Sequence, residues 1–355
     1  MAFRVETVML GPDTDQYAGK GQESLSIARV AAAARRVESL GFDGTTAPEA
    51  GHDPFLPLAI AAEHTERVAL GTNVAVAFPR SPMATAQVAW DLQALSGGRF
   101  NLGLGTQVKA HNERRYSAPW IAPPGPRLRD YLLCMKAMFD SFQNGGKPDY
   151  QGDYYQYTLT APFFNPGPIE HPHVPIYIAA VNNYMARLSG ELCDGLRLHP
   201  ISTFAHTRAE VLPNVEAGAK KSGRALSDID IIGAPFLAIG ENEEDVEKAK
   251  QDLKQHIAFY ASTPTYHSVL EFHDWMDVAG ALHKLSRAGE WTEMPKQITD
   301  EMLHEWAIVA TCDEFAGVLA DRCCDIYDTV LLDLPPKLWQ NEDWVKETVH
   351  TLQQA

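Results

Sequence analysis

The spacing of apolar residues changes repeatedly along the chain, between the spacing typical of strands and the spacing typical of helices. Helical spacing of apolar residues predicts helices at 23–40, 53–64 and 81–95, where Asp53-Pro54 and Ser81-Pro82 are typical helix starts. Strict alternation of strands and helices favours a parallel sheet, because two neighbouring parallel strands need a crossover connection. Eight short apolar or β-branched segments between the helical ones predict strands, at 3–10, 42–47, 68–76, 99–106, 176–181, 195–199, 229–239 and 327–334.

Eight strand–helix units favour a closed barrel over an open sheet. No G-x-G-x-x-G motif follows the first strand, which argues against a dinucleotide-binding open sheet. A length of 355 residues also allows two domains, but no linker divides the chain. We therefore predict an α/β fold in which residues 1–355 form one (β/α)8 TIM-barrel domain. Three segments interrupt the alternation and are predicted insertions, at about 107–125, 147–165 and 260–305.

The charge balance excludes several classes of partner. Asp and Glu number 46 against 30 Lys and Arg, a net charge of −16, which disfavours nucleic acid and anionic membrane surfaces. The chain has no apolar run of ~18 residues, and its first residues lack a signal-peptide pattern, so the expected location is cytoplasmic. The five Cys include no C-x-x-C pair, and no His and carboxylate cluster has metal-ligand spacing, so no metal site is predicted.

The carboxyl ends of the predicted strands are the place to look for chemistry, because TIM barrels carry their active sites there. These ends are small and rich in amides, as at 103–107 and 179–183. Small residues let a flat ring lie against the backbone, and free N–H groups at a helix start bind phosphate. No nucleophile motif such as G-x-S-x-G is present. The pattern indicates a small-molecule enzyme in which a cofactor supplies the reactive group.

Two long segments carry a family resemblance. Residues 69–107 (ALGTNVAVAFPRSPMATAQVAWDLQALSGGRFNLGLGTQ) and 176–199 (IYIAAVNNYMARLSGELCDGLRLH) resemble the bacterial luciferase-like flavin- and deazaflavin-dependent oxidoreductases. The stretches GHDPFLPLA at 51–59 and QVKAHNERRYS at 107–117 are similar to the actinobacterial branch that uses coenzyme F420, a deazaflavin. The resemblance implies F420 as the cofactor. FMN is the alternative, since both ligands share a tricyclic ring, a ribityl chain and a phosphate.

The resemblance also assigns residues to the cofactor. It implies a non-proline cis peptide at Asn73–Val74 under the ring, and a phosphate site at the ends of the fourth and fifth strands. Five cations against two acids at 107–130 suit the anionic deazaflavin tail, although these cations could also form a solvated loop that pairs with neighbouring acids. The implied cofactor-binding residues are Asn73, Val74, Ala75, Gly105, Thr106, Gln107, Lys109, Ala180, Val181, Asn182 and Asn183.

Two residues after the second strand are the candidates for proton transfer. Glu49 lies where the family commonly has an acid facing the ring, and a carboxyl group against an apolar ring suits proton transfer; the alternative is an exposed loop carboxylate. His52 is the second candidate, with helix capping before Asp53-Pro54 as its alternative. His199 and Asp333 stand at other strand ends, where His199 lines the pocket or is a satisfied core histidine.

The expected reaction is hydride transfer between F420 and a small, largely apolar carbonyl, alcohol or activated alkene. Related deazaflavin sugar-phosphate dehydrogenases carry a His where this chain has Ala50, and an acid where it has Gln107-Val108, which argues against glucose 6-phosphate. The alternatives are a monooxygenase that uses O₂ and reduced FMN from a separate flavin reductase, a non-enzymatic flavin carrier, and a cofactor-free hydrolase. Family members are commonly homodimers or higher homo-oligomers, and the aromatic segment 260–305 is expected to form a lid or an interface.

Overall fold

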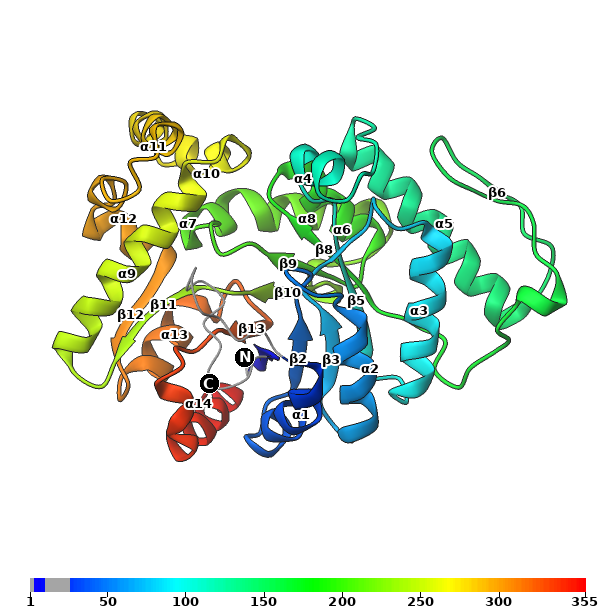
Figure 1. Ribbon diagram of the computed structural model, residues 1–355, viewed down its shortest axis with the longest axis horizontal. Coiled ribbons are helices and arrows are strands. Elements are labelled where there is room, and N and C mark those ends of the chain that lie inside the picture. Colours follow the sequence, from blue (N-terminus) through cyan, green and yellow to red (C-terminus); the bar gives the residue numbers. More distant parts are fainter. Residues whose placement is uncertain (1–2, 10–25) are drawn as a thin grey trace.

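Eight parallel strands close a barrel at the centre of the molecule (Figure 1). The computed structural model describes residues 3–9 and 26–355. Each strand pairs with the next around the ring, and the last pairs with the first, so the predicted (β/α)8 barrel is confirmed. In ring order the strands are β1 (Arg4–Val8), β2 (Gly44–Ala47), β3 (Ala69–Thr72), β5 (Phe100–Gly105), β8 (Ile176–Ala180), β9 (Gly195–Leu198), β10 (Asp230–Gly233) and β13 (Thr329–Leu332).

Helices cover the outside of the barrel and bury the main apolar core against the strands. The predicted starts at 53–54 and 81–82 hold: Asp53 Oδ1 accepts the Phe55 N–H at 2.9 Å, and Ser81 Oγ accepts the Ala84 N–H at 3.1 Å. The end of the predicted first strand and the start of the predicted helix at 23–40 lie outside the described residues. The covering helices include α1 (Val30–Ser39), α2 (Phe55–His64), α3 (Pro82–Leu95), α5 (Pro124–Asn144), α6 (Asn183–Leu192), α8 (Leu212–Lys221), α13 (Phe315–Cys323) and α14 (Glu342–Gln354), whereas α9 (Glu243–Ala261) packs outside this main core.

Two predicted strands are interrupted. The segment 68–76 divides into β3 and β4 (Ala75–Val76) at the Asn73–Val74 peptide bond, which is cis. The segment 229–239 divides into β10 and β11 (Phe236–Gly240) on either side of Pro235, which has no N–H to donate to a ladder. β11 leaves the barrel and pairs in parallel with β12 (Ala307–Thr311), a strand that the sequence pattern did not predict.

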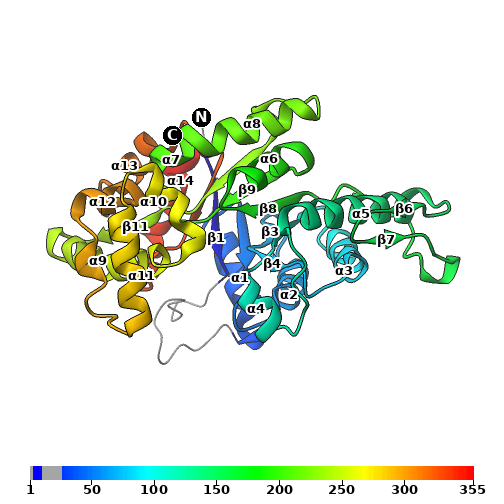
Figure 2. The same cartoon turned by 90° about the horizontal axis from the view of Figure 1, so that it is seen from above.

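The three predicted insertions form distinct structures. Residues 107–125 contain the short helix α4 (Lys109–Arg114), and 147–165 contain an antiparallel hairpin of β6 (Tyr150–Gln151) and β7 (Gln156–Tyr157). The segment 260–305 contains α10 (His267–Phe272), α11 (Met276–Ala288) and most of α12 (Asp300–Trp306), which share a second apolar cluster with α9, β11 and β12. The hairpin and α10–α12 lie on opposite sides of the barrel (Figure 2). Among the helices described, none is long and apolar enough to cross a membrane.

A buried ion pair fills the middle of the barrel. Arg197 on β9 donates from Nη1 to Glu6 Oε2 on β1 at 3.0 Å, and from Nη2 to Asn101 Oδ1 on β5 at 2.9 Å. The two ionised side chains are 3% and 9% exposed. Glycines on neighbouring strands make the space: a Cβ on Gly71 would lie 2.8 Å from Arg197 Nη2, and one on Gly44 would lie 2.9 Å from Glu6 Cγ. The strand register and these glycines therefore make the space that the buried Arg197–Glu6 ion pair occupies.

Removing one member of this pair should destabilise the barrel. In Glu6→Leu the guanidinium of Arg197 stays buried without its counter-charge, so the free energy of unfolding should fall by about 3–5 kcal/mol. The double variant Glu6→Leu/Arg197→Met should recover much of that loss, because no isolated charge remains. Urea denaturation of the two single variants and the double variant measures this. Strictly additive losses would show that the pair has no coupling.

Candidate functional site

A cavity of about 430 Å³ opens at the carboxyl end of the barrel. Inward-facing residues one layer above the ion pair form its base, among them Val8, Asn73, His199 and Asp333, with Arg197 below them. This volume is in the range of small-molecule sites. The structure therefore places a cavity at the strand ends where the sequence predicts chemistry.

One wall of the cavity comes from outside the barrel. β11 and the turn after β13 supply apolar side chains, including Phe236, Leu237 and Leu334. Asp252, His256 and Tyr260 of α9 add the polar groups of this wall. Sequence reasoning missed the wall, although the spacing of those three residues at i, i+4 and i+8 puts them on one helix face.

The β3–β4 interruption brings three predicted residues together. Asn73 and Val74 line the cavity, and a Cβ on Gly105 would lie 2.7 Å from Val74 Cγ2, so only glycine leaves space for the valine. The Thr72 hydroxyl accepts the Gly103 N–H at 2.9 Å and donates to its carbonyl at 2.6 Å, which joins β3 to β5 beside the interruption. These contacts hold the backbone of Asn73 and Val74, the Asn73–Val74 strip, at the edge of the cavity.

The predicted phosphate site lies at the start of α6. Asn182 caps this helix, since its Oδ1 accepts the Met185 N–H at 3.0 Å. The N–H groups of Asn183 and Tyr184 lie in the first turn, before any intrahelical acceptor, and point at the helix N-terminus. The Asn183 side chain donates to Glu210 at 3.4 Å, so it is turned to a protein partner and only its backbone N–H remains in the first turn.

The turn between β5 and α4 lies next to the α6 N-terminus, because β5 and β8 are neighbours in the barrel. Gln107 has a left-handed φ of 56° and accepts the Val108 N–H on its own side chain, while the Thr106 carbonyl accepts from Asn112. Lys109 is exposed, and its Nζ lies 3.9 Å from Glu113 Oε1.

Of the eleven predicted cofactor-binding residues, Asn73 and Val74 line the cavity and the other nine do not. The side chains of Ala75 and Ala180 pack in the main core between strands and helices, and they do not line the cavity. Val181 is half-buried at the end of β8. Any contribution of Ala75 and Ala180 to a ligand is therefore through the backbone.

The predicted basic patch at 107–130 is smaller than its composition indicates. Arg127 is buried: its Nε donates to Tyr155 Oη at 2.9 Å, and its guanidinium stacks over the Phe78 ring. Arg129 forms an ion pair with Glu191 at 2.9 Å. The cations that stay exposed are on and next to α4, so the prediction of five available cations is wrong for these two, which serve the core and a neighbouring acid.

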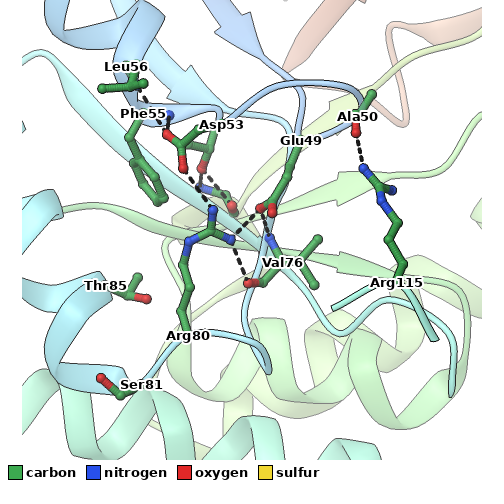
Figure 3. Close-up of polar contacts among 12 residues, drawn as sticks. Glu49, Ala50, Asp53, Phe55, Leu56, Val76, Arg80, Ser81, Thr85 and Arg115 are labelled. Carbon is green, nitrogen blue, oxygen red and sulfur yellow. Dashed lines mark hydrogen bonds and ion pairs between the residues drawn. The ribbon is translucent and has the colours of Figure 1, made fainter. Parts of the chain in front are cut away.

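Glu49 is buried and paired (Figure 3). Its Oε2 accepts the Val76 N–H at 2.7 Å and Arg80 Nη1 at 2.6 Å, while Arg80 also contacts Asp53 at 3.0 Å. The side chain is 6% exposed, so Glu49 is not a free loop carboxylate. Burial and the nearby Glu49 carboxylate raise the pKa of Tyr116. Glu49 thus joins the loop after β2 to β4.

His52 lies in the same loop but is exposed, and it is not part of the cavity lining. The carbonyl of Ala50, in the loop between Glu49 and His52, accepts a hydrogen bond from Arg115 of the α4 segment (Figure 3). The structure therefore brings α4 to this loop, and leaves the two proton-transfer candidates in different environments.

His199 lies in the cavity wall, at the end of β9. Its Nδ1 accepts the Ile201 N–H at 3.1 Å, and its Nε2 is 3.4 Å from Tyr266 Oη. The imidazole stacks on Tyr266 at a centroid distance of 4.7 Å, and it makes a T-shaped contact with Tyr260 at a centroid distance of 4.8 Å. Burial lowers the pKa of His199 to about 4. Of its two predicted roles, the pocket-lining one describes its position.

Comparison with known proteins gives the family. The model of the luciferase-like monooxygenase family matches residues 8–328. The chain belongs to this family. An uncharacterised protein of Mycobacterium tuberculosis is 42% identical to this luciferase-like chain over 305 residues, covering 86% of the chain and 89% of the relative.

Two further relatives of this luciferase-like chain carry functional names. The 5,10-methylenetetrahydromethanopterin reductase of Archaeoglobus fulgidus is 28% identical over 286 residues, covering 78% of this chain and 80% of that protein. The structure of the coenzyme F420-dependent tetrahydromethanopterin reductase from Methanopyrus kandleri superposes with a TM-score of 0.74 at 20% identity, over 99% of this chain and 97% of that one. At that identity the superposition supports the fold.

Glu49→Gln tests whether the carboxylate supports the loop. The amide cannot form the ion pair with Arg80, so the free energy of unfolding should fall by about 1–3 kcal/mol. Asp53→Asn is the matched control: Asp53 contacts the same guanidinium but its side chain is 40% exposed, so its loss should stay within about 0.5 kcal/mol. Chemical denaturation measures both. Equal stability of Glu49→Gln and wild type would remove the supporting role.

Proposed function

We propose that this luciferase-like protein is a coenzyme F420-dependent oxidoreductase. It transfers hydride between the deazaflavin and a small, largely apolar carbonyl, alcohol or activated alkene. The observation that carries the proposal is the cavity itself, which extends from the Asn73–Val74 strip to an apolar wall of β11. The names of the archaeal reductases support a deazaflavin cofactor.

The residues at the barrel mouth fit a flat, polar-edged ring with an anionic tail. Asn73 and Val74 would hold the ring beside Gly105, and the first turn of α6 with the Thr106–Gln107 turn would hold the phosphate. Register places Thr46 on the inward face of β2, and its buried hydroxyl lacks a hydrogen-bond partner in the part of the chain described. When bound, the deazaflavin supplies the hydride donor or acceptor.

The charge of the cavity favours an uncharged substrate. Glu6 compensates Arg197, and His199 is neutral above pH 5 because burial lowers its pKa to about 4. Asp252 and Asp333 add acidic groups to the lining. A phosphorylated substrate would therefore meet no uncompensated arginine among the lining residues, in agreement with the expectation against glucose 6-phosphate.

The candidates for proton transfer take different roles in this proposal. Glu49 acts through the backbone of β4, which it holds by the Val76 N–H, because its Oε2 already accepts two hydrogen bonds. His52 is exposed in the loop after β2 and does not line the cavity. A homo-oligomer stays a prediction: the hairpin insertion carries the exposed apolar side chains that an oligomer would bury, Leu159, Phe163 and Phe164.

The second candidate function is a monooxygenase that uses O₂ and reduced FMN from a separate flavin reductase. The family model that matches 8–328 is described as luciferase-like monooxygenase, which favours it. Both cofactors would occupy the same ring and phosphate positions. Direct binding of each cofactor separates the two functions.

Cofactor binding by the purified protein is the first test. Titration with oxidised F420 and, separately, with FMN should show saturable quenching of cofactor fluorescence for F420, with FMN bound at least about tenfold more weakly because its tail offers fewer anionic groups to α4 and α6. Tight FMN binding without F420 binding would overturn the proposal and favour the monooxygenase. Saturable binding without turnover of any carbonyl, alcohol or alkene would favour the flavin carrier.

Asn182→Asp tests the phosphate position. Aspartate caps a helix as well as asparagine does, so α6 should keep its stability, while the added negative charge repels an anionic tail. F420 affinity should fall about tenfold or more. Asn242→Asp is the matched control, since Asn242 caps α9 in the same way, with its Oδ1 accepting the Asp245 N–H at 3.0 Å. Unchanged F420 affinity in Asn182→Asp would move the phosphate site elsewhere.

A further inference from the structure

We propose that His199 binds the oxygen atom of the substrate, as a neutral hydrogen-bond donor through its Nε2–H, and that Tyr266 is the positioning residue that keeps the imidazole neutral and oriented. This deepens the proposed function, because it assigns the substrate an oxygen acceptor at a defined position in the cavity. The proposal depends on the contacts of both ring nitrogens and on the two tyrosines around them.

The hydrogen bond at Nδ1 fixes the tautomer. The Ile201 backbone N–H donates to Nδ1 at 3.1 Å, so this nitrogen carries a lone pair and no proton. A neutral imidazole with a bare Nδ1 has its proton on Nε2. Protonation of Nδ1 would set two N–H groups against each other, so the backbone of the β9 turn opposes the imidazolium form.

The aromatic contacts exclude water from the ring. Tyr266 covers one face of the imidazole, and Tyr260 makes a T-shaped contact with it. Burial lowers the pKa of His199 to about 4 and raises that of Tyr266 to about 12. The other titratable groups of the cavity lining are Arg197 of β9, Asp252, His256 and Tyr260 of α9, and Asp333 after β13. His199 and Tyr266 are therefore both uncharged across the neutral pH range.

His199 lines the cavity, and the contact of its Nε2 with Tyr266 is long enough for a ligand to compete for the Nε2–H. Its distance to Tyr266 Oη is 3.4 Å, longer than the 2.7–3.2 Å of an ordinary N–H···O bond. An oxygen in the cavity at ordinary distance would be the better acceptor. A neutral imidazole donor polarises a carbonyl without placing a charge beside it. The site should therefore select ketones, aldehydes or alcohols over hydrocarbons of the same shape.

Binding of a matched pair of probes tests this selection. Cyclohexanone and methylenecyclohexane have nearly the same shape, but only the ketone accepts a hydrogen bond. Ligand-observed NMR, on protein with and without oxidised F420, should show the ketone bound about fivefold more tightly. In His199→Phe the ratio should fall to about one, and His199→Gln, which keeps an N–H donor, should retain part of it. His64→Phe, at an exposed site at the far end of α2, should keep the wild-type ratio.

Imidazole ¹⁵N NMR gives a readout that does not depend on a ligand. The Nε2–H tautomer of His199 should persist from about pH 5.5 to 9. Tyr266→Phe keeps the stacked ring and should leave this unchanged, whereas Tyr266→Ala should bring the His199 titration up toward its ordinary range near pH 6.5. If His199 carried its proton on Nδ1 in wild type, or if Tyr266→Ala did not change its titration, the proposal would be overturned.

The two proposals fail in different ways. If wild type binds no F420 but the cofactor-free protein still prefers the ketone through His199, the proposed cofactor is wrong and the role of His199 stands. If a folded His199→Phe binds F420 normally and keeps the fivefold ratio, the role of His199 is wrong and the proposed function stands. Thermal melting of each variant establishes that it is folded.

Discussion

Burial of Arg197 and Glu6 inside a closed barrel is the constraint on which much of the structure depends. Two opposite charges in a nearly water-free space are stable only when each has its partner, and further hydrogen bonds stabilise them, as Asn101 does for Nη2 of Arg197. The guanidinium and carboxylate also need volume, which explains the glycines on the strands around them. At Gly103 a Cβ would lie 2.0 Å from the Thr72 carbonyl and 3.2 Å from Arg197, so backbone and cation together exclude a side chain.

The same layer sets the character of the cavity above it. Because Glu6 neutralises the charge of Arg197, the cavity base presents a hydrogen-bonded cation without a net excess of positive charge. The next residue of β9 on the inward face, His199, is held neutral by the Ile201 N–H and by two tyrosine rings. Glu49 at the loop after β2 is compensated by Arg80. Each of these charged or titratable groups is matched within the protein, which leaves the apolar wall and a few directed donors to select the ligand.

The sequence predicted the barrel because the apolar periodicity of helices and strands, and the residues that start and end them, depend on short stretches of chain. Eight apolar segments and helix starts such as Ser81-Pro82 follow from short-range rules. β12 was missed because it forms a ladder only with β11, which leaves the barrel at Pro235, and that pairing depends on a contact between distant segments. The ion pair was missed for the same reason, since Glu6 and Arg197 are 191 residues apart. Arg127 looked available as one of several cations, and only the tertiary structure shows it stacked on Phe78.

The candidate site residues also divide into those whose position depends on the local chain and those whose role depends on tertiary contacts. The family resemblance implied the Asn73–Val74 cis bond, which the structure contains, and it implied a phosphate site at Asn182, which caps the start of α6. Side-chain roles depend on what surrounds the group. Glu49 and His199 are both titratable residues at strand ends, yet an arginine partners one and aromatic rings enclose the other. An ion pair holds a carboxylate in place as a fixed anion, whereas an apolar enclosure keeps the imidazole of the cavity-lining His199 uncharged. The environment therefore favours His199 over Glu49 as the group that meets the substrate.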